Sequence, residues 1–200
     1  MTESTKTTDP KSAFSRRAFL QGSSAVAAAT ALQQQAAEAT ENTGAAVVSG
    51  EQAITLNVNG EDRKVTIEPR ATLLEVLRYN LDLTGAKPVS LDGSSGASTI
   101  LIDGKPVAAS TTLAMQAVGK KIETVESLAG DAIPKAFVKH DASQCGFCTP
   151  GFVVAVRALL NKNPQASSDD IRKGLNGNIC RCGTYDNIVD AVVDVVKGGD

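Results

Sequence analysis

The four cysteines are the residues of this sequence that point most directly to chemistry. Cys145 and Cys148 form a C-x2-C pair in "QCGFCTPG". Cys180 and Cys182 form a C-x-C pair in "NICRCG", with thirty-one residues between the two pairs. This spacing permits three kinds of site: a tetrathiolate metal site, two disulfides, or a thiol-redox C-x-x-C motif.

The surroundings of the cysteines favour a metal site over redox thiols. Cys145 and Cys148 immediately precede a predicted helix, where unpaired N–H groups and the positive end of the helix dipole stabilise thiolates. A thioredoxin-like motif needs a βαβ context, and no such pattern precedes Cys145. Metal and disulfides both stay open on spacing alone. Four glycines allow backbone amides to approach the sulfur atoms closely: Gly146, Gly151, Gly177 and Gly183.

The elements that position the cysteines are short helices, which the apolar pattern predicts from residue 131 onward. Thr149 is the expected N-cap of the second helix, with Pro150 at its first helical position. Ser167 and Asp170 have the spacing of an N-terminal cap in the third. Together these segments predict a four-helix bundle whose junctions carry the cysteines. The helical pattern covers residues 133–140, 149–163, 167–177 and 186–196.

A second pattern, with an apolar residue at every other position, precedes the helices. It predicts a β-hairpin over residues 54–67 that turns at Asn59-Gly60, and a second hairpin that turns at Asp103-Gly104. Thr72 and Glu75 have capping-box spacing at the start of a helix between the hairpins. A last strand is expected within residues 121–128. We therefore predict an α+β chain, with a domain over residues 51–130 before the helical domain over 131–200.

The N-terminal residues 1–39 have the pattern of a twin-arginine signal peptide. Arg16 and Arg17 precede Phe19, Leu20 and an alanine-rich stretch, and residues 37–39 read "AEA", as a signal peptidase requires. We expect export to the periplasm, with residues 40–50 as a linker. No stretch reaches about 18 uninterrupted apolar residues, so no integral membrane segment is expected in the mature chain.

Composition excludes two other classes of function. The 200 residues carry 20 basic and 22 acidic side chains, a net charge of −2, without a basic cluster or stripe. Nucleic-acid binding is therefore not expected. His140 is the only histidine and falls on an apolar helical face, so we assign it no ligand role and expect no hydrolase site around it.

Five segments of the sequence resemble the small iron–sulfur subunit of the molybdenum hydroxylases, the xanthine dehydrogenase and aldehyde oxidoreductase family. The resemblance covers about 150 residues, and the paired cysteine motifs carry most of its specificity. It implies a ferredoxin-like β-grasp domain followed by a four-helix bundle that binds a [2Fe-2S] cluster. The segments are "LDLTGAKP", "GAST", "LIDGKPVA", "QCGFCTPGFVVAV" and "LNGNICRCGTY".

The resemblance also implies the roles of particular residues. Gln144 would contact the pterin of a molybdenum cofactor, and Cys182 would be the cluster ligand closest to it. Catalysis would take place on a large molybdopterin-binding partner that oxidises aldehydes or N-heterocycles. Electrons would then leave through a flavin subunit or a periplasmic acceptor. The cluster ligands implied are Cys145, Cys148, Cys180 and Cys182.

Zinc in the same tetrathiolate stays an alternative to iron. With zinc or disulfides at the four cysteines, the chain would be a non-redox structural or export-escort subunit. This alternative belongs to a different class of function from electron transfer.

A second cluster site of the family is occupied by serines in this sequence. Plant-type ferredoxin domains hold a cluster with C-x4-C-x2-C and a distant fourth cysteine. Ser90, Ser95 and Ser98 stand at that spacing in "SLDGSSGAST", and Ser110 stands at the family's fourth position. A serine hydroxyl is harder to deprotonate than a thiol and offers iron a hard oxygen. We therefore predict that this domain binds no iron and that the chain carries one cluster.

Overall fold

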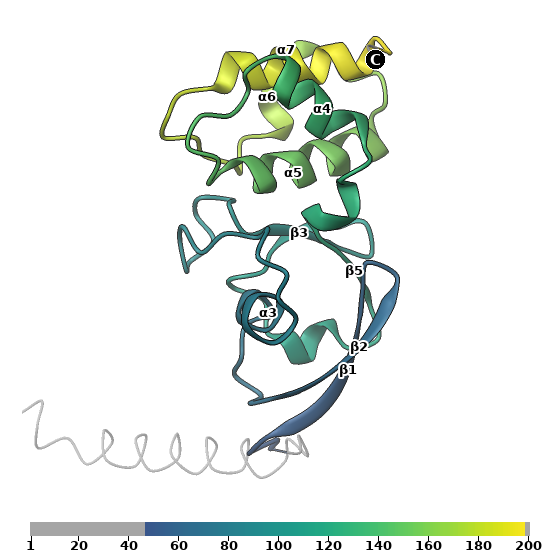
Figure 1. The fold of residues 1–200 in the computed structure, drawn as a ribbon, viewed down its shortest axis with the longest axis vertical. Helices are drawn as coiled ribbons and strands as arrows, with labels where there is room; N and C mark the ends of the chain where they lie inside the picture. Colours follow the sequence, from purple (N-terminus) through teal and green to yellow (C-terminus); the bar gives the residue numbers. More distant parts are fainter. Residues whose placement is uncertain (1–46, 199–200) are drawn as a thin grey trace, which may run out of the picture. The chain divides into compact units, whose positions relative to one another are not determined.

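The computed structural model describes residues 47–198, and residues 48–198 belong to one unit, Val48–Asp200 (Figure 1). The predicted signal peptide, residues 1–39, lies outside the described residues, as does most of the predicted linker. Within the described part, no helix is long and apolar enough to cross a membrane.

The first half of the unit is built on a mixed five-stranded sheet with the order β2-β1-β5-β3-β4. β1 and β5 are parallel neighbours, and the other pairs are antiparallel. Both predicted hairpins and the predicted last strand are present. The strands are β1 (Gln52–Val58), β2 (Glu61–Ile67), β3 (Thr99–Ile102), β4 (Lys105–Ala108) and β5 (Lys121–Glu123).

A helix packs on one face of this sheet and closes its core. α3 (Leu73–Glu75) continues as a π-helical segment, η1 (Val76–Asn80). The predicted capping box is present: the Glu75 N–H donates to Thr72 Oγ1 at 3.2 Å, and the Thr72 N–H donates to Glu75 Oε2 at 2.8 Å. The core between helix and sheet contains fully buried side chains from both, among them Leu56, Leu73, Val76, Leu77, Ile100 and Ile122.

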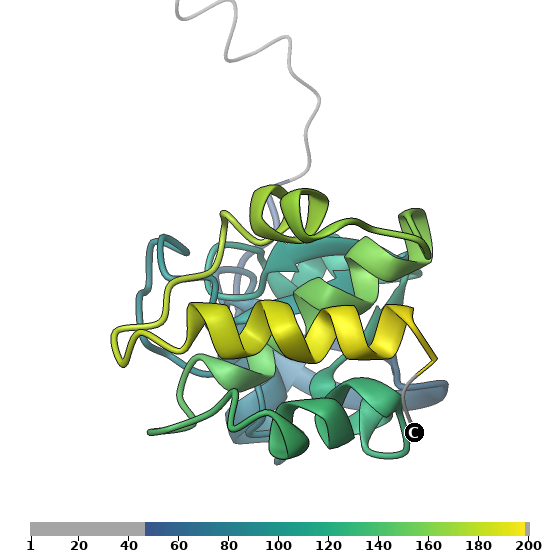
Figure 2. The same ribbon diagram turned by 90° about the horizontal axis from the view of Figure 1, so that it is seen from above.

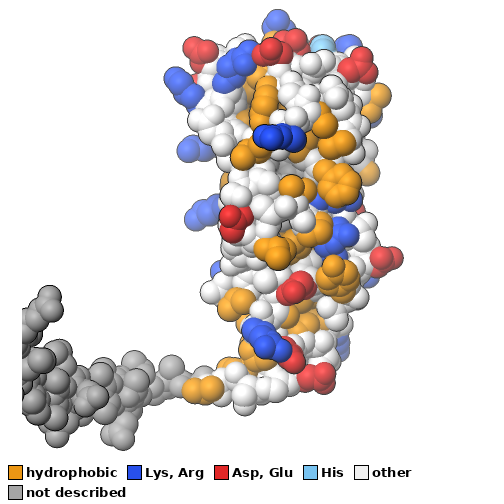
Figure 3. Space-filling view, turned by 90° about the vertical axis from the view of Figure 1, so that its left-hand side faces the viewer, with side chains coloured by type: hydrophobic (Ala, Val, Ile, Leu, Met, Phe, Trp, Pro, Cys, Tyr) orange, Lys and Arg blue, Asp and Glu red, His pale blue; other side chains and the backbone are white. Residues whose placement is uncertain are grey.

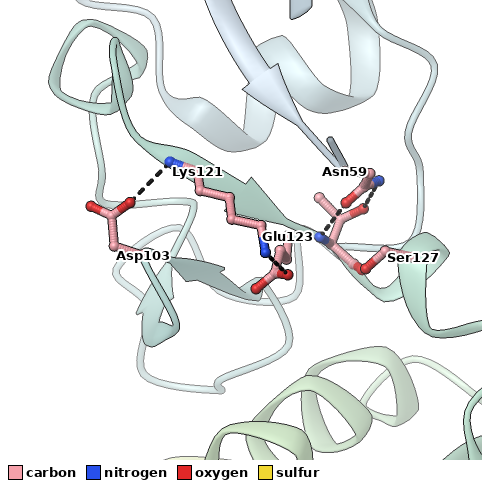
Figure 4. A network of polar contacts seen from close by, with 6 residues as sticks. Asn59, Asp103, Lys121, Glu123 and Ser127 are labelled. Atoms are coloured by element: carbon pink, nitrogen blue, oxygen red, sulfur yellow. Dashed lines mark hydrogen bonds and ion pairs between the residues drawn. The ribbon is translucent and has the colours of Figure 1, made fainter. Parts of the chain in front are cut away.

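Two hairpin turns fasten the short strand β5 from either side (Figure 4). Asn59 accepts a hydrogen bond from the Thr124 N–H at 2.8 Å and donates to Thr124 Oγ1 at 2.9 Å. Asp103 Oδ1 accepts from the Lys121 N–H at 2.9 Å. Both turn residues have a positive φ, 55° and 50°, which Asn and Asp tolerate better than most residues. Side chains of the two turns therefore satisfy backbone groups that a three-residue strand leaves unpaired.

The second half consists of four helices with a separate hydrophobic core. α7 lies across the others in Figure 2, with α4 on one side and α6 on the other, and α5 lies next to β3 in Figure 1. Val125 and Leu128, in the short helix η3 (Val125–Leu128), also pack against this helical core. The four helices are α4 (Ala132–Lys139), α5 (Thr149–Lys162), α6 (Ser168–Gly174) and α7 (Tyr185–Val196).

The helix starts agree with the sequence in one case and differ in another. Ser167 and Asp170 form the expected reciprocal cap of α6. The prediction that Thr149 caps α5 is wrong by one residue, because Cys148 occupies the N-cap position and Thr149 is already helical. The Thr149 hydroxyl is instead 2.8 Å from Ser143 Oγ. The cysteine thus stands directly at the helix terminus.

Candidate metal centre

The four cysteines lie in the two loops that join the helices. Cys145 and Cys148 lie between α4 and α5, and Cys180 and Cys182 lie between α6 and α7. Figure 1 shows both loops on the same side of the helices. All four cysteines are free thiols in the structure.

The thiols meet across the loops in two pairs. Cys145 shares a side-chain hydrogen bond with Cys182, and Cys148 shares one with Cys180. Each pair therefore takes one thiol from the C-x2-C loop and one from the C-x-C loop. Among residues 47–198, no group of three or more His, Cys, Asp or Glu side chains is arranged to hold a single metal ion.

The two pairs differ in their exposure to solvent. Cys145 and Cys182 form an exposed outer pair. Cys148 is half-buried and Cys180 is buried, with 5% of its surface exposed, so they form an inner pair. The centre therefore has one side toward solvent and one side toward the interior of the chain.

In the inner pair, the two thiols have opposite pKa shifts. Burial, the hydrogen bond with Cys180 and the nearby thiolate charges together raise the pKa of the Cys148 thiol to about 12, and burial is the largest cause. Burial also raises the pKa of Cys180. Hydrogen bonds from the Thr184 hydroxyl and N–H, from Cys148 and from the Cys182 N–H outweigh that effect and lower the pKa to about 7. Cys180 therefore ionises more readily than Cys148.

The outer pair repeats this asymmetry. Hydrogen bonds from the Phe147 N–H and the Cys182 thiol lower the pKa of Cys145. The Cys145 N–H lowers the pKa of Cys182, but the Cys145 side chain, burial and the neighbouring thiolate charges outweigh it and raise that pKa. Each loop therefore supplies one thiol that ionises readily. Because metals bind thiolates and not thiols, metal binding at this centre would release protons.

Two residues next to Cys180 support its position, and the sequence prediction assigned them no role. Cys180 Sγ lies 3.2 Å from Thr184 Oγ1, and the Cys180 N–H donates to the Tyr185 hydroxyl at 2.8 Å. The Tyr185 ring packs edge-on against Phe152 at 6.3 Å. Thr184 is the N-cap of α7 but makes no capping bond with its side chain. In a sequence, a threonine before a helix predicts an N-cap. The only sequence signal that Thr184 contacts a thiol instead is the cysteine four residues earlier.

The paired thiols fit a [2Fe-2S] cluster. Such a cluster takes four cysteine thiolates, two at each iron. A single tetrahedral zinc ion needs four ligands around one point, which two separate pairs do not provide. Gly146 and Gly183, each with φ above 80°, shape the two loops, and such residues let backbone N–H groups approach sulfur. The donor set and its division into pairs therefore suit two irons better than one zinc.

The four serines predicted at the second cluster position also lie in two pairs. Ser90 Oγ is 2.7 Å from Ser95 Oγ, and Ser98 donates to Ser110 Oγ at 3.0 Å. Ser98 and Ser110 are 2% and 6% exposed. We call residues 90–98 the serine loop. Its three serines and Ser110 form two hydroxyl pairs, one within the loop and one between Ser98 and Ser110.

Gln144 and two exposed hydrophobic residues also lie in the cysteine loops. Gln144 is exposed and directly precedes Cys145 of the outer pair. Phe147 and Ile179, one in each cysteine loop, are 57% and 53% exposed. The face on which these loops lie carries hydrophobic patches between charged side chains (Figure 3). His140 lies apart from the thiols, with Nε2 3.1 Å from Asp194 Oδ2.

Comparison with known proteins gives the same class of site. Residues 124–193 match the [2Fe-2S] binding domain family. The chain is 44% identical over 144 residues to the nicotine 6-hydroxylase small subunit of Paenarthrobacter nicotinovorans. This alignment covers 70% of this chain and 87% of that protein. It is 34% identical over 200 residues to the aldehyde oxidoreductase iron-sulfur-binding subunit PaoA of Escherichia coli O157:H7, covering 90% and 87% respectively.

A solved structure extends the likeness to the whole described fold. Quinoline 2-oxidoreductase from Pseudomonas putida 86 contains a chain that superposes with a TM-score of 0.72 at 42% identity. The match covers 76% of this chain and 97% of that chain.

Fold and site together define an electron-transfer protein of the [2Fe-2S] class. The chain belongs to the small iron–sulfur subunits of the molybdenum hydroxylases, the xanthine dehydrogenase and aldehyde oxidoreductase family. It is an oxidoreductase subunit. The predicted α+β fold and the family resemblance are confirmed.

Replacing Tyr185 by Phe tests the support of Cys180. Tyr185→Phe keeps the ring contact with Phe152 but leaves the partly buried Cys180 N–H without its acceptor, so we expect a loss of about 1–3 kcal/mol in the free energy of unfolding. Urea unfolding at equal iron content measures it. Tyr79→Phe is the control, because Tyr79 is 77% exposed and its hydroxyl makes no hydrogen bond within residues 47–198. Equal losses in both variants would contradict the role of Tyr185.

Proposed function

We propose that this chain carries electrons for an exported molybdenum hydroxylase through one [2Fe-2S] cluster, held by Cys145, Cys148, Cys180 and Cys182. The observation that carries the proposal is the meeting of the four thiols in two pairs across two helix junctions. A bound [2Fe-2S] cluster supplies single-electron transfer. Every other contribution comes from the residues around it.

The asymmetry of the centre supports a direction for electron transfer. The outer pair, Cys145 and Cys182, is accessible to a partner, whereas Cys148 and Cys180 face the interior. Gln144 stands beside the outer pair and offers both a donor and acceptors to a pterin on the partner. Phe147 and Ile179, both exposed in the cysteine loops, provide apolar surface that a partner would cover. Electrons would enter from a large molybdopterin-binding subunit on this side.

The substrate class is proposed from the relatives. They are named for nicotine, nicotinate, quinoline and aldehydes. These names support oxidation of an aldehyde or an N-heterocycle by the partner subunit. A flavin subunit or a periplasmic acceptor would then take the electrons.

The proposal of a single cluster rests on the serine loop. Serine hydroxyls provide no soft ligand for iron, and here they are engaged with each other at 2.7 and 3.0 Å. Electrons would therefore pass from the cysteine centre to the acceptor without a second cluster in this chain.

Iron analysis tests the cluster and its ligands. Anaerobically purified full-length protein should be red-brown, with about two irons and two sulfides per chain. Cys148→Ser and Cys180→Ser should each abolish this colour, because each removes a thiolate from the inner pair. Ser98→Ala is the control and should leave the iron content unchanged. A colourless wild-type protein, holding zinc or disulfides, would disprove electron transfer by this chain.

Restoring cysteines tests the single-cluster proposal. The quadruple variant Ser90→Cys, Ser95→Cys, Ser98→Cys and Ser110→Cys places two thiol pairs where two hydroxyl pairs now meet. We expect its iron content to rise from about two to about four per chain, with a second paramagnetic signal after reduction. Four irons in the wild type would overturn the proposal, and an unchanged two irons in the variant would show that the loop is no longer a cluster site.

The export proposal rests on Arg16 and Arg17 and is tested by a charge-conserving change. Arg16→Lys with Arg17→Lys keeps the positive charge but removes the twin-arginine motif that the export machinery reads. We expect the variant to stay in the cytoplasm on cell fractionation, while the wild type and a Lys11→Arg control reach the periplasm. Periplasmic accumulation of the double variant would contradict twin-arginine export.

A further inference from the structure

The serine loop makes direct contact with the segment that carries Cys180. The Ser95 carbonyl accepts a hydrogen bond from the Ile179 N–H at 3.0 Å. The next carbonyl along the loop, that of Gly96, accepts from Asn178 Nδ2 at 3.0 Å. Asn178 is 9% exposed and Ile179 directly precedes Cys180. Two successive carbonyls of one loop thus hold the two residues that lead into a proposed ligand.

Gly96 is also in tight contact with the segment that follows Cys148. A Cβ on Gly151, three residues after Cys148, would lie 2.3 Å from the Gly96 oxygen. A Cβ on Gly96 would lie 2.3 Å from the Gly177 oxygen and 2.7 Å from Asn178 Nδ2. No side chain fits at either glycine without moving backbone. The Gly96 backbone therefore lies between the segments that carry the two thiols of the inner pair.

The serine loop is itself fixed to the sheet. The Ala97 carbonyl accepts from the Lys87 N–H at 3.0 Å, and the Ser98 carbonyl accepts from the Ala109 N–H at 3.0 Å. Thr99 donates to the Gly96 carbonyl through Oγ1 at 2.6 Å. These bonds join the loop to Lys87, to Thr99 at the start of β3 and to Ala109 just after β4, and together they hold Gly96 in place.

Resting on the proposed function, we propose that the serine loop positions the inner thiol pair, and that Gly96 and Asn178 thereby set the reduction potential of the centre. The potential of an iron–sulfur cluster depends on hydrogen bonds to the sulfurs and on their surroundings. The backbone N–H and sulfur of Cys180 already meet Tyr185 and Thr184. A shift of the 177–179 segment would change both contacts. Asn178 is thus a positioning residue that acts through Cys180.

A charge-matched pair of variants tests this role in the anaerobically purified full chain. Asn178→Asp keeps the size of the side chain but turns a donor toward the Gly96 carbonyl into an acceptor. Asn176→Asp adds the same charge two residues earlier, on an exposed side chain that makes no hydrogen bond in the described part of the chain. We expect Asn178→Asp to shift the one-electron reduction equilibrium at least tenfold, which is about 59 mV, and Asn176→Asp to shift it less than threefold.

A glycine pair provides the second comparison. Gly96→Ala forces the loop away from Gly177, whereas a Cβ on Gly104, in the turn between β3 and β4 and outside the serine loop, meets nothing within 4 Å. Both glycines have a positive φ, 68° and 74°, so the backbone strain is similar. We expect Gly96→Ala to shift the electron paramagnetic resonance g-values and the potential, or to lose iron, with Gly104→Ala unchanged.

The outcomes separate this inference from the proposed function. Wild-type protein without iron overturns both. Wild-type protein with about two irons, together with equal potentials and spectra within each matched pair, overturns the positioning role alone. If Asn178→Asp fails to fold, as judged by circular dichroism, the glycine pair decides in the same way.

Discussion

The pairing of one thiol from each helix junction is the constraint on which this structure depends. Helices of seven to fourteen residues are marginal in isolation and need packing or a fixed end to persist. Here the loops that precede α5 and α7 each bring two thiols to the centre, so the N-terminal ends of both helices lie beside it. Cys148 and Thr184 are the N-cap residues of α5 and α7, and neither caps its helix with its side chain. Both side chains belong to the cysteine centre instead.

Much of this arrangement could be predicted from the sequence. The apolar alternation of residues 54–67 and the capping signals at Thr72 and Ser167 are local, and local signals gave the right elements. The cysteine spacing also pointed to one site, because ligands at helix junctions have few other places to meet. The start of α5 was misplaced because a threonine is normally the better cap, and the pattern does not show that Ser143 engages its hydroxyl.

Other features could not be predicted because they depend on contacts distant in sequence. The sequence around Gly96 does not indicate that its backbone lies in close contact with Gly151 and Gly177. These residues come together only when the helices pack on β3. The division into an inner and an outer thiol pair likewise follows from three-dimensional packing, as burial of Cys180 shows. The sequence shows that the four candidate ligands are cysteines. Which of them are buried and which are exposed depends on the folded structure.

The hydroxyl pairs of the serine loop have a consequence for how the protein matures. Ser98 and Ser110 close their part of the sheet with a hydrogen bond that needs nothing from the cell. With the single cluster proposed above, the sheet half would reach its final form even under iron starvation. Maturation would then wait on inorganic supply at the helical half alone.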